Sequence, residues 1–267
     1  MDDKNTVALP QATTVAYGAH PSQFIDVYTP EGAGPHPVVV LIHGGFWRLP
    51  WGRDLMHGLA ADLLGRGFAV VNVEYRRLAE DGGGWPGTCE DVVAALRTIA
   101  ALADDEELGL DLSRVGLVGH SAGGHLALWA TKYAPLPVRV VVSQAGVVDL
   151  RSAARERLDG NAEGRLPAAV EFVGGEAGDA DFDAAYALAS PIELLPLGPA
   201  VHQLVLHGDV DNRVPFQQSL DYVAAAHAAG DSVELAVFTG MGHFEVIDAA
   251  HESWLRAVEE LTRRLGA

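Results

Sequence analysis

The feature that most constrains this chain is a repeated alternation between short apolar runs and longer segments of helical periodicity. The apolar runs are rich in valine and mostly unbroken, as expected of strands that are buried on both faces of a parallel sheet. They span residues 38–42, 68–73, 115–118, 138–142, 204–206 and 233–238. Because strands that alternate with helices are joined by right-handed crossovers, the pattern predicts an α/β fold with a doubly wound, mostly parallel sheet and helices on both faces.

Two of the intervening segments carry a helical stripe of apolar residues. One stripe comprises Val92, Val93, Leu96, Ile99 and Ala103, and the other comprises Trp254, Val258, Leu261 and Leu265. Thr88 and Asp91 stand at capping-box spacing and are expected to open the first helix. Residues 24–28 alternate in character and are expected to form an edge strand at an antiparallel start of the sheet.

The length of the chain suits one hydrophobic core. Its 267 residues, 49% of them hydrophobic and 20% charged, predict a single globular domain over residues 1–267. Residues 151–196 break the alternation with glycines, prolines, charges and short helical pieces. This region is expected to form either a small partial cap or an ordinary surface connection.

The charge of the chain excludes several classes of partner. Acidic residues outnumber lysine and arginine by 36 to 18, which gives a formal net charge of −18, so neither a nucleic acid nor a membrane is expected as a partner. The first residues lack a basic and apolar leader pattern, and no apolar run approaches the roughly eighteen residues of a membrane span. Cys89 is the only cysteine, which excludes a disulfide framework and fits a reducing compartment. A cytoplasmic location is therefore expected.

The strongest chemical motif is Gly-His-Ser-Ala-Gly at residues 119–123, which directly follows the run at 115–118 and precedes a helical stretch. In this context G-x-S-x-G is typical of a nucleophilic serine on a tight turn, where the glycines relieve crowding and Ser121 is exposed at a helix N-terminus. The backbone N–H of Ala122 and the positive end of the helix dipole then face any negative charge that develops there. The alternative is a glycine-rich turn that only packs or binds phosphate.

A second motif, His-Gly-Gly-Phe-Trp at residues 43–47, closes the first predicted parallel strand. Its adjacent glycines free backbone N–H groups to point into the same cleft. By analogy with the HGGG-type motif, Gly45 and Phe46 are expected to donate to an oxyanion, and Gly44 is expected to permit the turn. His43 is expected to be a buried residue that orients this loop.

Candidates for an acid and a base follow the last two predicted strands. His-Gly-Asp-Val-Asp stands at residues 207–211, and Gly-His-Phe stands at residues 242–244. Asp209 and Asp211 compete for the role of the acid, whereas His243 alone among the eleven histidines has the position required of the base. The aspartates do not fit a calcium loop and no zinc motif occurs, so no metal is expected.

Together these motifs resemble the α/β-hydrolase superfamily over residues 20–265, and within it the esterase and lipase branch that includes the kynurenine formamidases. The resemblance to formamidases is carried by HGGFW, GHSAGGHLA and HFEVID, at residues 43–47, 119–127 and 243–248. Glu-Tyr-Arg at residues 74–76 also resembles the Asp-Tyr-Arg run of hormone-sensitive-lipase-like esterases. DNRVPFQQS at residues 211–219 is similar to a segment of prolyl-oligopeptidase-family peptidases.

The resemblance implies a serine hydrolase whose triad is Ser121, Asp211 and His243, in the chain order that the superfamily uses. The superfamily places the acid three residues beyond the glycine that follows the strand, which favours Asp211 over Asp209. The oxyanion hole is then expected at Gly44, Gly45, Phe46 and Ala122. The resemblance implies no organic cofactor and no metal.

The expected substrates are small-molecule esters or amides with a small acyl group, such as short-chain aryl esters or aryl formamides. Phe46 and Trp47 follow the oxyanion glycines directly, so a bulky ring is expected to shorten the acyl pocket and contact the substrate. The alternative for Trp47 is that it packs inward as core. Two other functions stay open, a prolyl-oligopeptidase-like peptidase or amidase and a ligand-binding homologue that has lost catalysis.

Overall fold

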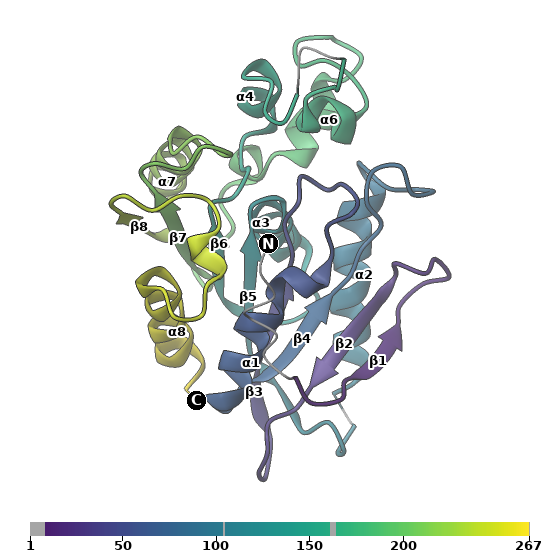
Figure 1. Ribbon diagram of the computed structural model, residues 1–267, viewed down its shortest axis with the longest axis vertical. Coiled ribbons are helices and arrows are strands. Elements are labelled where there is room, and N and C mark those ends of the chain that lie inside the picture. The colour runs from purple at the N-terminus through teal and green to yellow at the C-terminus, as the bar shows by residue number, and fades with distance from the viewer. Residues whose placement is uncertain (1–8, 104, 161–163, 267) are drawn as a thin grey trace.

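The computed structural model describes residues 9–103, 105–160 and 164–266, which form an eight-stranded sheet with helices against both of its faces (Figure 1). The order of the strands is β1-β2-β4-β3-β5-β6-β7-β8. β2 is antiparallel to β1 and β4, and the other neighbouring strands are parallel. The strands are β1 (Thr13–Ala16), β2 (Phe24–Tyr28), β3 (His36–Ile42), β4 (Ala69–Val73), β5 (Leu110–His120), β6 (Val138–Gln144), β7 (His202–Gly208) and β8 (Ser232–Phe238). The predicted α/β fold with a mostly parallel sheet is confirmed.

Helices cover the two faces of the sheet unequally. One apolar core lies under α2 (Gly87–Ala101), α3 (Ala122–Tyr133) and α7 (Gln217–Ala229). The other lies under α1 (His57–Gly65) and α8 (Glu252–Leu265). Side chains of β3 alternate between these cores, as the period of a strand requires: Val40 and Ile42 belong to the first, and Val39 and Leu41 to the second. β3 is therefore buried on both faces.

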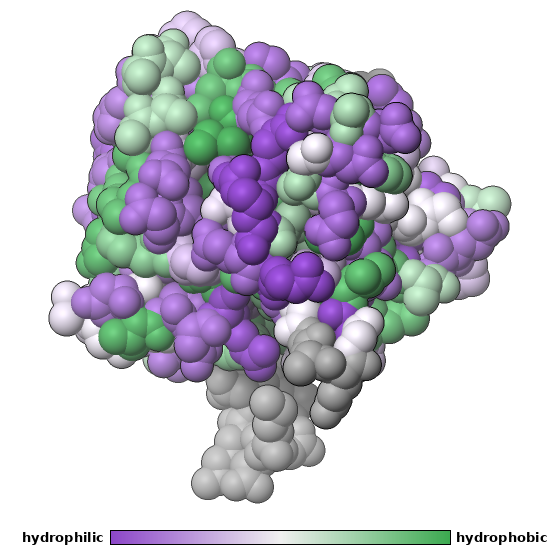
Figure 2. Space-filling model, turned by 90° about the horizontal axis from the view of Figure 1, so that it is seen from above, coloured by the Kyte–Doolittle hydropathy of each residue, from purple (hydrophilic) through white to green (hydrophobic). Residues whose placement is uncertain are grey.

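Residues 151–160 and 164–196, which we call the cap segment, lie between β6 and β7 in the chain, and their role as a cap rather than a surface connection stays a prediction. Helices α4 (Leu150–Arg155), α5 (Ala168–Val173) and α6 (Asp183–Ala189) are followed by the 3-10 helix η2 (Pro191–Leu194). Figure 1 shows α4 and α6 at the top of the molecule, above β6 and α3. Seen from above, this face carries a band of strongly hydrophilic residues between patches of hydrophobic ones (Figure 2). No helix among the described residues is long and apolar enough to cross a membrane.

Two local predictions are wrong. Strand β2, at residues 24–28, is not at the edge, because β1 pairs with it and takes the edge position. Thr88 and Asp91 do not form a capping box, since Thr88 lies inside α2 and its hydroxyl bonds to the carbonyl oxygen of Arg76 at 2.5 Å. The carboxylate of Asp91 instead pairs with the guanidinium of Arg76 at 2.7 Å. Thr88 and Asp91 therefore hold the segment that follows β4 against helix α2.

The register of the parallel strands decides which loops meet. Ile42 at the end of β3 is paired with Gly119 of β5, and Gly208 at the end of β7 is paired with Phe238 of β8. Because parallel strands end at the same edge of a sheet, the loops after β3, β5, β7 and β8 gather at one edge. These are the four loops that carry the predicted site residues.

Candidate active site

Ser121 occupies the tight turn between β5 and α3. Its backbone has φ 55° and ψ −118°, a region that is costly for a residue with a Cβ. A Cβ at Gly123 would lie 2.0 Å from the carbonyl oxygen of Ile42, and a Cβ at Gly119 would lie 2.0 Å from the carbonyl oxygen of Gly123. The Ser121 N–H donates to the carbonyl oxygen of Gln144 at 2.8 Å. Glycine is thus needed on both sides of Ser121, as the motif predicts.

His243 and Asp211 lie in hydrogen-bond contact. The Nδ1 of His243 is 2.6 Å from Oδ2 of Asp211, whose side chain is fully buried. A carboxylate only accepts, so Nδ1 carries the proton and Nε2 is left to accept one from Ser121, which lines the same cavity as His243. Asp209 is exposed and accepts from the Gly240 N–H at 2.6 Å. The structure therefore brings Asp211, and not Asp209, to His243.

The surroundings of Asp211 keep its carboxylate charged. Burial alone would raise the pKa of Asp211, but hydrogen bonds from His207 and His243 outweigh burial and hold the pKa well below its usual range. Oδ1 also accepts from the backbone N–H groups of Arg213 at 2.8 Å and Val214 at 2.9 Å. Asp211 is therefore ionised at neutral pH and stabilises a positive charge on its neighbouring imidazole. His207 was not among the predicted site residues, although it begins the same motif.

The predicted oxyanion residues surround Ser121. Gly45 and Phe46 line the cavity that contains Ser121, and Ala122 is the first residue of α3. Residues 45–47 have φ values of 107°, 50° and 56° in succession, so this loop is strained. A Cβ at Gly44 would lie 3.1 Å from the Cβ of Ser121, which shows how closely the loop approaches the elbow. The assignment of individual N–H donors stays a prediction.

The expected substrate contact at Trp47 is wrong. Its side chain is fully buried and is not among the residues that line the cavity. The indole stacks on the ring of Phe172 in α5 with centroids 4.4 Å apart, and it meets the ring of His125 edge-on at 5.1 Å. Trp47 therefore packs inward as part of the core, which was the alternative prediction. Phe46 does line the cavity, so the expected contact there is retained as a prediction.

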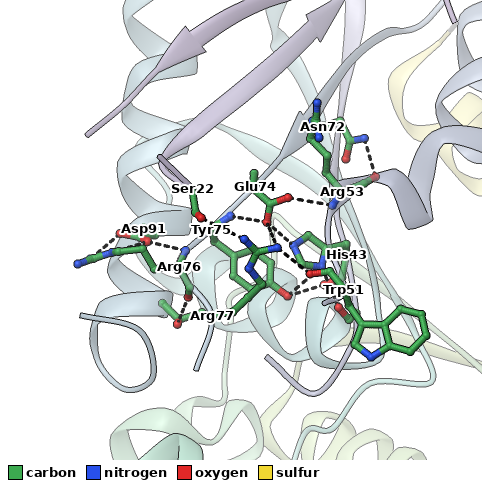
Figure 3. Close-up of polar contacts among 12 residues, drawn as sticks. Ser22, His43, Trp51, Arg53, Asn72, Glu74, Tyr75, Arg76, Arg77 and Asp91 are labelled. Carbon is green, nitrogen blue, oxygen red and sulfur yellow. Dashed lines mark hydrogen bonds and ion pairs between the residues drawn. The ribbon is translucent and has the colours of Figure 1, made fainter. Parts of the chain in front are cut away.

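His43 is buried behind the oxyanion loop, as expected. Its Nε2 lies 2.9 Å from Oε1 of Glu74, and its ring stacks on Tyr75 at 4.1 Å (Figure 3). The hydroxyl of Tyr75 donates to the carbonyl oxygen of His43 at 2.8 Å. Burial would raise the pKa of Glu74, but the hydrogen bond with His43 and the charge of Arg77 lower it. An ionised carboxylate therefore holds the base of the loop.

The same network fixes Trp51, which was not among the predicted site residues. The guanidinium of Arg77 donates to the carbonyl oxygen of Trp51 at 2.8 Å (Figure 3). Trp51 lines the cavity and is 39% exposed. A Cβ on Gly45 would lie only 2.3 Å from the Cβ of Trp51, so the positive φ of Gly45 and the position of this ring depend on each other. No sequence motif includes Trp51, because its place in the cavity wall depends on this packing against Gly45.

Arg48 joins the strained loop to the cap segment. The side chain is almost fully buried and pairs with Asp159 and with Glu171 of α5. Its Nε donates to Glu171 at 2.9 Å, and its Nη2 donates to the carbonyl oxygen of Leu166 at 2.8 Å. Because Arg48 follows residues 45–47 directly, the cap segment anchors the end of the strained loop.

A cavity of about 180 Å³ opens over Ser121. Its walls combine aromatic rings with charged side chains. They are formed by Gly45, Phe46, Trp51, Leu55, His120, Ser121, Asp159, Arg165, Arg213, His243 and Phe244. The loops after β3, β5, β7 and β8 all contribute, and Asp159 and Arg165 come from the cap segment.

His120 ties the elbow to the loop of the base. Its Nε2 lies 3.0 Å from the carbonyl oxygen of His243, which can only accept, so Nε2 donates. Burial, with the neighbouring His243, lowers the pKa of His120 to about 3, so this ring is neutral at physiological pH. The variable position of the G-x-S-x-G motif thus has a structural task that the motif alone does not specify.

One cluster of metal-ligand side chains occurs among the described residues, at His202, Glu234 and Glu260. The carboxylate of Glu260 already contacts Arg263 at 2.5 Å and Arg264 at 2.7 Å. These guanidinium groups satisfy the carboxylate and repel a cation, so we assign no metal to this cluster.

Comparison with known proteins identifies the family of the chain. The BD-FAE family matches residues 25–225, which is well over half of the chain. The chain belongs to the BD-FAE family. Its sequence is 28% identical over 254 residues to Esterase LipC of Mycobacterium tuberculosis, a match that covers 88% of this chain and 60% of that protein. The chain thus spans less than two thirds of this relative.

Solved structures agree with this placement. A truncated form of a carbohydrate esterase from gut microbiota has a TM-score of 0.80 at 23% identity, covering 96% of this chain and 98% of its own, which supports the fold. A bacterial heroin esterase has a TM-score of 0.72 at 28% identity, covering 91% of this chain and 80% of its own. This chain therefore shares its architecture with solved esterases.

We predict that Arg48→Ala destabilises the fold by about 3 kcal/mol, because it leaves the carboxylates of Asp159 and Glu171 without their buried cation. The matched control is Arg66→Ala, which breaks an exposed pair with Asp62 one helical turn away and should cost about 0.5 kcal/mol. Urea unfolding measures both, and hydrogen exchange should quicken at residues 45–47, 159–160 and 164–171 in the first variant alone. Equal costs for the two variants would contradict the anchoring role of Arg48.

Proposed function

We propose that this protein is a serine esterase that hydrolyses esters with a small acyl group by two-step acyl transfer. One observation carries the proposal: the buried carboxylate of Asp211 binds Nδ1 of His243 in a cavity that also contains Ser121 on a strained turn. Membership of the BD-FAE family and the esterase names of the relatives support it.

In each half of the reaction His243 acts first as a base and then as an acid. Oγ of Ser121 attacks the carbonyl carbon while Nε2 of His243 takes the hydroxyl proton, and the bond to the leaving alcohol then breaks as His243 gives that proton to the leaving oxygen. Water attacks the acyl-enzyme in the same way. Its proton passes to His243 and then to Oγ as the bond between Ser121 and the acyl group breaks. Asp211 stabilises the imidazolium in both halves and stays unprotonated.

The negative charge of each tetrahedral intermediate develops beside the oxyanion loop. We expect the backbone N–H groups of Gly45, Phe46 and Ala122 to hold it, together with the positive end of α3. The buried contacts of His43 and Arg48 keep this loop in its strained conformation before substrate arrives. Preorganised donors of this kind need no rearrangement as the charge forms.

Two features favour a small acyl group. The cavity, about 180 Å³, is smaller than the range of roughly 300–1,000 Å³ typical of ligand pockets. Phe46 stands in its wall next to the oxyanion glycines. The esterase names of the relatives favour esters over the aryl formamides and peptide amides that other parts of the motif resemblance imply.

We expect Ser121→Ala and His243→Ala each to lower kcat for 4-nitrophenyl acetate by roughly 10⁵ to 10⁶, because each removes one end of the same proton transfer. The double variant should lose little more than either single variant. Steady-state kinetics on the three purified proteins tests this. A double variant whose loss equals the product of the single losses would show that the two residues do not act as a unit.

A second pair of variants separates the aspartates. Asp211→Asn should lower kcat by roughly 10⁴, because the amide no longer enforces the histidine tautomer that leaves Nε2 free. Asp209→Asn, two residues away and exposed, should change kcat little. Measuring kcat on the same ester compares them directly, and the reverse ranking would transfer the role of the acid to Asp209.

Acyl-chain preference provides a third test. The unmodified protein should hydrolyse 4-nitrophenyl acetate with a higher kcat/KM than the octanoate. Phe46→Ala should shift the preference toward longer chains, by about 0.8 kcal/mol for each methylene that becomes buried. A preference of the unmodified protein for the octanoate would contradict the small-acyl proposal and leave the triad untouched.

A further inference from the structure

The charged wall of the cavity contrasts with the rest of the molecule. The chain has a formal net charge of −18, yet the charged side chains that line the cavity include Arg165 and Arg213. Asp159 also lines it, but its carboxylate is already paired with Arg48 at 2.5 Å and lies 3.5 Å from Arg165. Asp159 is therefore already engaged by arginines other than Arg213.

The second feature of the wall is the guanidinium of Arg213. Within the described ranges 9–103, 105–160 and 164–266, no carboxylate forms an ion pair with its guanidinium. The carboxylate of Asp211 is nearby, but it is fully buried and its Oδ1 is taken by the backbone N–H groups of Arg213 and Val214. These two hydrogen bonds fix the backbone of the loop at Arg213. The side chain of Arg213 lines the cavity.

The position of Arg213 assigns it to one half of the substrate. It stands on the loop that carries Asp211, beside the base, and His243 delivers its proton to the leaving oxygen. The acyl half is expected at Phe46, by the oxyanion loop. Phe244, 46% exposed, lines the same side of the cavity as His243, so the leaving group has an aromatic surface and a cation within reach.

We propose that Arg213 binds a carboxylate carried by the alcohol half of the ester, so that the preferred leaving groups are anionic hydroxy acids. The proposal rests on the serine esterase activity proposed above. A guanidinium forms two parallel hydrogen bonds with a carboxylate, which suits recognition of a planar anion at a partly exposed site. Such a group is found both in hydroxybenzoic acids and in sugar acids.

The experiment compares charged and neutral substrates with the same acyl group. 3-Acetoxybenzoate is measured against its methyl ester, and a mono-O-acetylated methyl glucuronoside against the corresponding methyl glucoside. In the unmodified protein we expect a kcat/KM ratio of charged to neutral substrate of about 5 for at least one pair, and the pair that shows it identifies the source of the carboxylate. Raising the salt from 0.05 to 0.5 M should bring that ratio toward 1, since screening weakens a partly exposed ion pair.

Variants test whether the ratio of kcat/KM for charged and neutral substrate depends on Arg213. Arg213→Gln should bring the ratio to about 1, and Arg213→Lys, which keeps the charge, should keep most of it. The matched control is Arg139→Gln, an exposed arginine at the start of β6 and hence at the opposite edge of the sheet, which should leave the ratio unchanged.

Two outcomes separate the proposals. A ratio near 1 for both pairs in the unmodified protein, or a ratio that Arg213→Gln does not reduce, overturns the role of Arg213. If the unmodified protein hydrolyses none of the four acetates, charged or neutral, the proposed esterase activity itself is overturned. The salt series needs no variant, so the role of Arg213 can be refuted even if Arg213→Gln fails to fold.

Discussion

The close approach of the first turn of α3 to the ends of β3 and β5 is the constraint on which the rest of the site depends. Gly119 and Gly123 lie so near to neighbouring backbone that any side chain would collide. This contact forces Ser121 into a left-handed conformation and aims it into the cavity. The other contacts of the site hold the neighbouring loops against this turn.

Two buried ion-pair systems hold the oxyanion loop from opposite ends. On the side of β4, Glu74 contacts His43 and, through Arg77, fixes the backbone of Trp51. On the side of the cap segment, Arg48 is held by two carboxylates. Buried charges cost free energy to desolvate, so they stabilise a structure only when paired and hydrogen-bonded. Here they stabilise a loop whose backbone would otherwise relax, which connects the cap segment to the chemistry.

The triad could be predicted because it depends on order along the chain. Ser121, Asp211 and His243 each follow a strand that valine-rich runs reveal, and parallel strands bring their loops to one edge. The spacing of the superfamily favoured Asp211 over Asp209, and the contact between Asp211 and His243 agrees with that choice. The hydrogen bond that Asp209 instead accepts from the Gly240 N–H could not be recognised in the sequence.

The residues that were missed or misassigned depend on contacts distant in the chain. Trp47 is buried because Phe172 of α5 stacks on it, and the predicted strand and helix patterns place no aromatic ring there. Arg48 and Glu171 are 123 positions apart. Trp51 and Arg213 reach the cavity through loop conformations that carry no periodic pattern. The sequence therefore predicts which loops meet, whereas the wall of the cavity needs the tertiary structure.

The most direct test of the account is covalent labelling with a fluorophosphonate, which reacts with a serine that a neighbouring base has activated. Intact-mass measurement should show one added phosphonyl group per chain, and peptide mapping should place it on Ser121. Labelling should disappear in Ser121→Ala and slow sharply in His243→Ala. A serine hydroxyl is a weak nucleophile until a neighbouring base takes its proton. A folded protein that takes up no label, or that takes it up equally fast without His243, would contradict the central claim that Ser121, His243 and Asp211 form one catalytic unit.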